Sequence, residues 1–192
     1  MIYLYHEVKH LRAMWFYIKG GNKMVEIIKV YKESFPSLRL IGKRYTHSDR
    51  GADGSFGNKW GEWFEKGYFK TLEELGSLTE NEGAYVGCMR CEEEFEYWIG
   101  MFFPEGTTVP EGYAYTDIPC GDIGTCWIYG REDNGEIYGQ EPHSMCMSKI
   151  IESGWEFAED AWFFERYNCP RFTTPDENGK VILDYCIYLK DE

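Results

Sequence analysis

Residues 84–103 read AYVGCMRCEEEFEYWIGMFF, and this stretch decides the fold. Two apolar runs, Ala84–Cys91 and Phe95–Phe103, flank an acidic turn at residues 92–94. Runs rich in aromatic and β-branched residues on either side of a polar break predict two strands joined by a tight turn. The segments before and after this pair of strands then determine the architecture.

The segment before the strand pair predicts two more strands and a helix. Side chains alternate in character over Val25–Tyr31, and Leu38–Tyr45 forms a second strand-like run. After a glycine-rich polar loop, Asn58 is placed to cap a helix that extends to about Leu75, because the apolar positions form one broad stripe. Gly67 lies inside this helix and costs about 1 kcal/mol relative to alanine.

The segment after the strand pair repeats the same order of elements. Strands are expected at Tyr113–Ile118 and Thr125–Tyr129, a helix at Pro142–Ser153, and strands at Trp162–Tyr167 and Val181–Leu189. Each half of the chain is therefore strand, strand, helix, strand, strand. Two such halves predict one α+β domain with an antiparallel sheet of about eight strands and two main helices on one side.

Residues 1–23 differ from the rest of the chain in charge. They hold four basic side chains and one glutamate, whereas the whole chain has a net charge of −13. Gly20-Gly21-Asn22 is typical of a linker, and Met24 directly precedes the first predicted strand. We expect residues 1–23 to be an N-terminal extension or a misassigned start, with an amphipathic docking helix as the alternative, and residues 24–192 to be the domain.

Composition excludes several classes of protein. Hydrophobic residues make up 43% of the chain, enough for a folded core, and no apolar run reaches membrane length. A pI of about 4.8 without a basic patch argues against direct nucleic-acid binding. The acidic surface attracts cations or serves solubility alone. Seven cysteines without a secretory leader predict reduced thiols in the cytoplasm.

Four short motifs occur in order along residues 24–190. They are Gly42-Lys43-Arg44-Tyr45, Tyr97-Trp98-Ile99-Gly100, Ile118-Pro119-Cys120-Gly121 and Phe164-Glu165-Arg166-Tyr167. This set, together with the duplicated order of elements, resembles the GyrI-like effector-binding domains. The resemblance implies a fold of two βαββ units with pseudo-twofold symmetry, as in SOUL proteins and in the sensing domains of AraC-type and MerR-type regulators.

The resemblance also implies a function. Sensing members of the family hold lipophilic cations between aromatic walls and a central glutamate, which matches Glu165 here. Some stand-alone members are hydrolases that open cyclopropane-containing electrophiles with the same glutamate, and another inhibits gyrase. Two positions depart from the family pattern: Ile123 replaces an aromatic residue, and Tyr188 stands where proline is common. The identity of a ligand is therefore not carried over.

The residues around Glu165 support a binding site on chemical grounds. In a strand, Phe163, Glu165 and Tyr167 face the same way. A carboxylate among aromatic side chains is costly to bury unless it is paired, and burial raises its pKa. A bound cation would compensate this cost. The alternative is a structural ion pair of Glu165 with Arg44, Arg166 or another basic side chain.

Aromatic side chains complete the predicted site. We expect a ligand that is cationic and aromatic or lipophilic, because cations bind the faces of tryptophan and tyrosine rings. The expected ligand-binding residues are Glu165, Trp63, Tyr85, Trp127, Phe163, Tyr167 and Tyr188. If the protein is instead a hydrolase, Glu165 is the expected general base and Tyr85 its aromatic partner.

Other motifs carry less chemistry. Cys88 and Cys91 form a CxxC, but zinc needs two further ligands at suitable spacing, and a strand would direct these two thiols to opposite faces. No metal or cofactor is expected. The acidic turn at residues 92–94 allows a third function, in which a carboxylate surface binds a protein partner; a homodimer is also possible.

Overall fold

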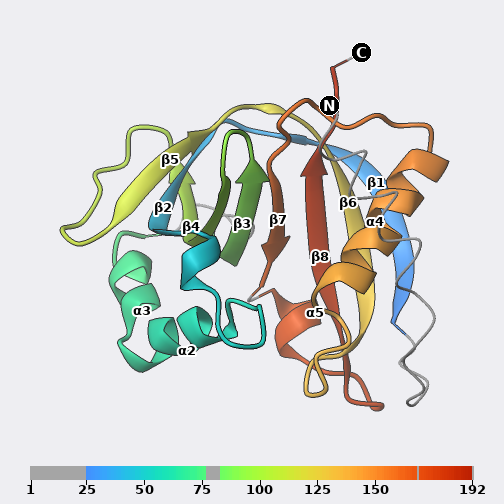
Figure 1. Cartoon of the computed structure of the whole chain (residues 1–192), viewed down its shortest axis with the longest axis horizontal. Helices are drawn as coiled ribbons and strands as arrows, with labels where there is room; N and C mark the ends of the chain where they lie inside the picture. The colour runs from blue at the N-terminus through green and yellow to red at the C-terminus, as the bar shows by residue number, and fades with distance from the viewer. Residues whose placement is uncertain (1–24, 77–82, 168, 192) are drawn as a thin grey trace.

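A computed structural model of the chain describes residues 25–76, 83–167 and 169–191 (Figure 1). The predicted extension at residues 1–23 lies outside these ranges, so the domain boundary at residue 24 stays a prediction. The strands are β1 (Glu26–Phe35), β2 (Leu38–Tyr45), β3 (Tyr85–Cys91), β4 (Phe95–Pro104), β5 (Ala114–Ile118), β6 (Gly121–Arg131), β7 (Phe163–Arg166) and β8 (Lys180–Tyr188). All eight predicted strands are therefore present.

The helices divide into two groups. The first follows β2 and comprises the 3-10 turn η1 (His47–Asp49), α2 (Gly57–Glu65) and α3 (Tyr68–Glu73); the second comprises α4 (Gln140–Glu152) and the short α5 (Pro170–Thr173). In Figure 1 the first group lies beside β2, β4 and β3, and α4 lies beside β6 and β1. Among the described residues, no helix is long and apolar enough to cross a membrane.

One continuous helix over residues 58–75 was expected, and the structure has two. Gly67 separates α2 from α3 with φ of 68°, in the left-handed region that glycine adopts without steric cost. The apolar stripe continues across the break, because Trp63 of α2 and Phe69 and Leu72 of α3 are all buried in the same core. The apolar spacing was thus correct, while the backbone turned at Gly67 and stayed helical at Gly61.

The eight strands form a single antiparallel sheet in the order β1-β6-β8-β7-β3-β4-β2-β5. Exchanging each strand of the first half of the chain for its counterpart in the second half reproduces this order in reverse. The pseudo-twofold axis therefore passes between β7 and β3, at the centre of the sheet. This confirms the α+β fold class and the two βαββ units, each of which is preceded by one further strand, β1 or β5.

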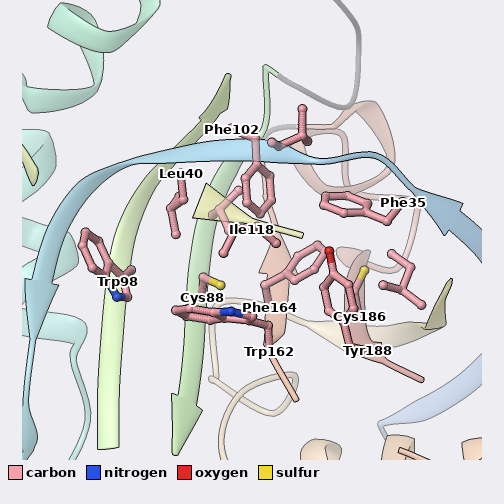
Figure 2. Packing of buried hydrophobic residues seen from close by; sticks show 13 residues of the cluster. Phe35, Leu40, Cys88, Trp98, Phe102, Ile118, Trp162, Phe164, Cys186 and Tyr188 are labelled. Atoms are coloured by element: carbon pink, nitrogen blue, oxygen red, sulfur yellow. The ribbon is translucent and has the colours of Figure 1, made fainter. Parts of the chain in front are cut away.

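One face of the sheet is covered by none of the helices that the structure describes. Short links at residues 36–37 and 119–120 lead the chain from one half of the sheet to the other. Phe35 and Ile118 beside these links pack with Phe102 and Phe164 on this face (Figure 2). Leu38 belongs to the same cluster. This buried layer explains why central strands such as β4 are apolar on both sides.

The opposite face carries the helices and is divided in two. Cys146 and Ile150 of α4 pack on β6 and β8 in one core, while residues of α2 and α3 pack on β2 and β4 in the other. The central strands β7 and β3 lie between these two cores. The helix-bearing face thus has a seam over β7 and β3, at the point where the pseudo-twofold axis passes through the sheet.

Candidate functional site

Glu165 lies on β7 at this seam. The strand alternates, so Phe164 packs into the layer without helices, while Phe163 and Tyr167 pack against the core of α4. Glu165 shares the helix-bearing face with Phe163 and Tyr167, as predicted from their spacing. Cross-strand pairing places Gly87 of β3 on one side of it and Tyr185 of β8 on the other.

Gly87 is the point at which side chains from three elements converge. A Cβ atom at this position would lie 2.7 Å from Tyr97 Oη, 3.3 Å from Trp60 Cζ2 and 3.5 Å from Glu165 Oε2. Any larger residue would push these groups apart, since contacts below 3.0 Å between such atoms require a shift. Across the symmetry axis, the carboxylate therefore faces a glycine rather than a second side chain.

The carboxylate of Glu165 has one hydrogen-bond donor among the described residues. Tyr167 Oη donates to Glu165 Oε2 at 2.6 Å. Burial raises the pKa of Glu165 to about 7, and the hydrogen bond from Tyr167 only partly opposes this rise. A half-buried carboxyl group that titrates near neutral pH is a recognised mark of a functional site.

The ion-pair alternative is not found within the described part of the chain. Arg166 points to the other face, where its guanidinium lies 2.7 Å from Glu33 and 3.0 Å from Asp184. Arg44 pairs with Glu96 at 2.8 Å. Each arginine considered as a partner of Glu165 is therefore committed to another acid.

Aromatic side chains from both halves of the domain surround Glu165. The rings of Trp60 and Tyr167 meet edge to face with centroids 4.8 Å apart, and Tyr138 lies 6.4 Å from Tyr167 on the other side. Trp60 Nε1 donates to Tyr97 Oη at 2.8 Å. Burial, and after it the charge of Glu165, raises the pKa of Tyr97 and Tyr167 well above the usual range, so both hydroxyls stay protonated.

His143 extends this group from α4. Its Nδ1 forms a hydrogen bond with Tyr185 Oη, and its ring lies 5.4 Å from Phe163. Burial lowers the pKa of His143, so the imidazole is neutral at pH 7. The site is thus a carboxyl group surrounded by neutral, mostly aromatic side chains.

The other predicted site residues lie farther out or on the other face. Trp63 lies on the inner side of α2, is fully buried, and donates a hydrogen bond from its indole N–H to Tyr45 Oη at 2.9 Å. Tyr85 stacks on Phe69 with centroids 3.9 Å apart, and its hydroxyl donates to Glu73 at 2.5 Å. Both residues belong to the core of α2 and α3.

Trp127 and Tyr188 lie on the face opposite Glu165. Trp127 alternates with Cys126 and Ile128, which belong to the core of α4. The ring of Trp127 is covered by Lys29, with Nζ 4.3 Å from its centroid. Tyr188 packs in the layer without helices and donates to the carbonyl of Pro119 at 2.6 Å. The structure does not bring these two residues together with Glu165.

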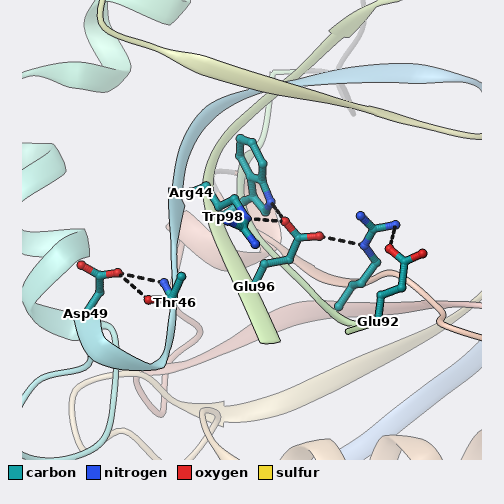
Figure 3. A network of polar contacts seen from close by, with 7 residues as sticks. Arg44, Thr46, Asp49, Glu92, Glu96 and Trp98 are labelled. Atoms are coloured by element: carbon teal, nitrogen blue, oxygen red, sulfur yellow. Dashed lines mark hydrogen bonds and ion pairs between the residues drawn. The ribbon is translucent and has the colours of Figure 1, made fainter. Parts of the chain in front are cut away.

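That opposite face holds its own charged groups, and they are paired. Glu96 accepts hydrogen bonds from Arg44 and Arg90, both at 2.8 Å, and from Trp98 at 2.9 Å (Figure 3). Burial would raise the pKa of Glu96, but these three hydrogen bonds together lower it.

The structure contains no metal centre among its described residues, where no group of three His, Cys, Asp or Glu side chains could hold an ion. Cys88 is buried and Cys91 is exposed, in keeping with thiols that point to opposite faces of β3. The CxxC therefore supplies no pair of ligands.

Comparisons with known proteins show the fold. No protein-family model and no curated protein matches the sequence. Among solved structures, SAV2435 bound to tetraphenylphosphonium gives a TM-score of 0.64 at 17% identity, over 85% of this chain and 94% of that one. A proposed bacterial transcription regulation protein of Staphylococcus aureus MU50 gives 0.61 at 17% identity, over 85% and 99%.

EcmrR, in a complex with DNA, gives a TM-score of 0.52 at 10% identity, over 98% of this chain and 64% of that chain. At such identities the likeness concerns the fold alone. It confirms the fold that the four GyrI-like motifs imply. Comparison of the sequence alone did not detect this likeness.

Proposed function

We propose that this domain binds lipophilic cations at Glu165. The observation that carries the proposal is a half-buried carboxyl group with no basic partner among the described residues, surrounded by neutral aromatic side chains. Burying an unpaired carboxylate is costly, and a cationic ligand would offset that cost. The glycine across the axis leaves Glu165 as the central charge of the site.

The aromatic residues suit the apolar part of such a ligand. A cation over the face of a tryptophan or tyrosine ring gains about 0.5–2 kcal/mol, and Trp60, Tyr138 and Tyr167 are each partly exposed near the carboxylate. SAV2435, which shares the fold, was solved with tetraphenylphosphonium bound, and this supports the same class of ligand here. Binding of this kind would serve either sensing or sequestration of such compounds.

The test is a calorimetric titration with tetraphenylphosphonium at pH 8. Glu165→Gln keeps the shape and the hydrogen bond from Tyr167 but removes the charge, so the affinity should fall at least about tenfold, or about 1.4 kcal/mol. Glu93→Gln removes the same charge from an exposed turn and should leave the affinity unchanged. Equal affinity of the Glu165→Gln variant and the unmodified protein would refute the proposal.

Hydrolysis of a strained electrophile is the second candidate. It is favoured by the pKa of Glu165 near 7, which suits a general base at neutral pH. The nearby phenol is Tyr167 rather than Tyr85, whose hydroxyl is bound to Glu73. Incubation with a cyclopropane-containing electrophile, followed by mass spectrometry, should reveal a product that has gained one water, and only with Glu165 intact.

Protein binding through the acidic turn has weaker support. The glutamates at 92–94 border a surface hollow of about 420 Å³ together with Arg44, Arg90 and Glu96. The two arginines offset part of the negative charge, so the carboxylates do not form an unbroken acidic surface. A protein partner and a homodimer both stay predictions from the sequence.

A further inference from the structure

Phe64 is a large apolar side chain that the fold leaves in solvent. It lies on α2, one turn after Trp60, and 60% of its surface is exposed. Its ring nevertheless makes three aromatic contacts, with centroids 5.3 Å from Phe69, 6.0 Å from Tyr85 and 6.3 Å from Trp60. Phe64 is thus the outermost ring of a connected aromatic group.

This group leads to Glu165. Trp60 contacts the ring of Tyr167, whose hydroxyl holds the carboxylate. Tyr85 lies on the same face of β3 as Gly87, and its carbonyl accepts a hydrogen bond from the backbone N–H of Tyr167 at 2.8 Å. A continuous set of rings therefore runs from the carboxylate at the seam to the exposed surface of α2.

The exposure of Phe64 differs in kind from that of Ile151 on α4. Both side chains are 60% exposed, and a single exposed hydrophobic residue needs no explanation by itself. Ile151, however, is not part of the set of rings that reaches Glu165. The two residues are thus equally exposed, but only Phe64 is connected through aromatic contacts to the residues around Glu165.

We propose that Phe64 is a specificity-determining residue that binds the apolar arm of the ligand. The ligand class is then cations that carry aromatic arms, whose charge lies at Glu165 while an arm covers Trp60 and Phe64. Compact quaternary ammonium ions would reach only the inner part of the site. This inference rests on the proposed function, because it assumes a cation at Glu165.

The experiment compares two cations on three proteins. Tetraphenylphosphonium and tetramethylammonium are titrated into the unmodified chain and into the Phe64→Ala and Ile151→Ala variants. An aromatic contact contributes about 0.5–1.5 kcal/mol, so Phe64→Ala should weaken tetraphenylphosphonium about two- to tenfold. Binding of tetramethylammonium should not change, and Ile151→Ala should alter neither affinity. Thermal unfolding of each variant checks that the fold is retained.

The outcomes separate the two proposals. If the unmodified chain binds tetraphenylphosphonium and Phe64→Ala binds it equally well, the role of Phe64 is overturned while cation binding stands. A loss that is equal for both cations also overturns it, since the arm would then play no part. If the unmodified chain binds neither cation, the proposed function fails and the role of Phe64 fails with it.

Discussion

Glu165 and Glu96 are two glutamates on opposite faces of one sheet, and their environments differ in one respect. Glu96 accepts hydrogen bonds from two arginines and a tryptophan, and its pKa falls despite burial. Glu165 accepts one hydrogen bond from the described part of the chain, donated by Tyr167, and burial raises its pKa. The charge is satisfied within the protein in the first case and left unsatisfied in the second.

Arg166, the residue after Glu165, lies on the same face as Glu96, and it too is paired with groups of opposite charge. It is 4% exposed and lies between Glu33 and Asp184, which is fully buried and also pairs with Arg171. The alternation of a single strand thus separates Arg166, which is paired with carboxylates, from Glu165, which has no basic partner among the described residues. We infer that the face without helices stabilises the fold, while the helix-bearing face carries the chemistry.

The largest expected effect comes from Asp184→Asn. This change leaves Arg166 and Arg171 without their shared carboxylate, and removing one partner of a buried ion pair costs about 3–5 kcal/mol. Urea unfolding should show this loss of stability. Affinity for tetraphenylphosphonium, measured under folding conditions, should stay the same. A loss of affinity in a folded variant would contradict the inference that the two faces have separate roles.

The pH dependence of stability is the next largest effect. Glu165 has a pKa of about 7 in the folded protein against 4.5 as its ordinary value, so the folded state holds the proton more tightly. Stability therefore falls as pH rises from about 4.5 to about 7 and is constant above, by about 3 kcal/mol in total. Urea unfolding across this range should show the fall in the unliganded protein.

Glu165→Gln is the control for that prediction. Burial lowers the pKa of His143, so His143 adds stability as pH rises through its own range and opposes Glu165. The difference in stability between the unmodified protein and the variant isolates the glutamate. A constant difference from pH 4.5 to 8 would show that Glu165 is as well satisfied as Glu96.

Glu96→Gln should have a smaller effect. The amide cannot accept from both Arg44 and Arg90, and hydrogen bonds to a charged group contribute about 1.5–3 kcal/mol each. Both arginine side chains are partly exposed, at 46% and 27%, so water replaces part of the loss and we expect about 2 kcal/mol. Chemical unfolding measures it, and an unchanged stability would mean that the network contributes nothing.

The element order and the shared face of Phe163, Glu165 and Tyr167 could be predicted from the sequence for identifiable reasons. Alternation in β7 placed Phe163, Glu165 and Tyr167 on one face, and it depends only on strand geometry. The repeated order of elements fixed the symmetry. Gly67 was recognised as a weak point of the helix, but sequence did not show that its backbone would turn left-handed.

The rest of the site depends on contacts that no local pattern encodes. Trp127 and Tyr188 lie on strands buried on both faces, where alternation does not tell which face bears the helices. Tyr138 comes from an irregular turn before α4. Gly87 and Tyr97 come close to Glu165 because of the register in which β3 pairs with β7 and with β4. The sequence motifs do not specify this register.

Tyr167→Phe should have the smallest effect, and it tests the comparison most directly. The change removes the one hydrogen bond that the carboxylate of Glu165 receives from a described residue, so the pKa of Glu165 should rise further. Above that pKa the folded state should lose about 1–2 kcal/mol, as expected for a hydrogen bond to a charged group, and below it almost nothing. Side-chain carboxyl NMR measures the pKa, and urea unfolding at pH 5 and pH 9 measures the stability. An unchanged pKa would mean that Glu165 has another donor and is closer to Glu96 than the structure indicates.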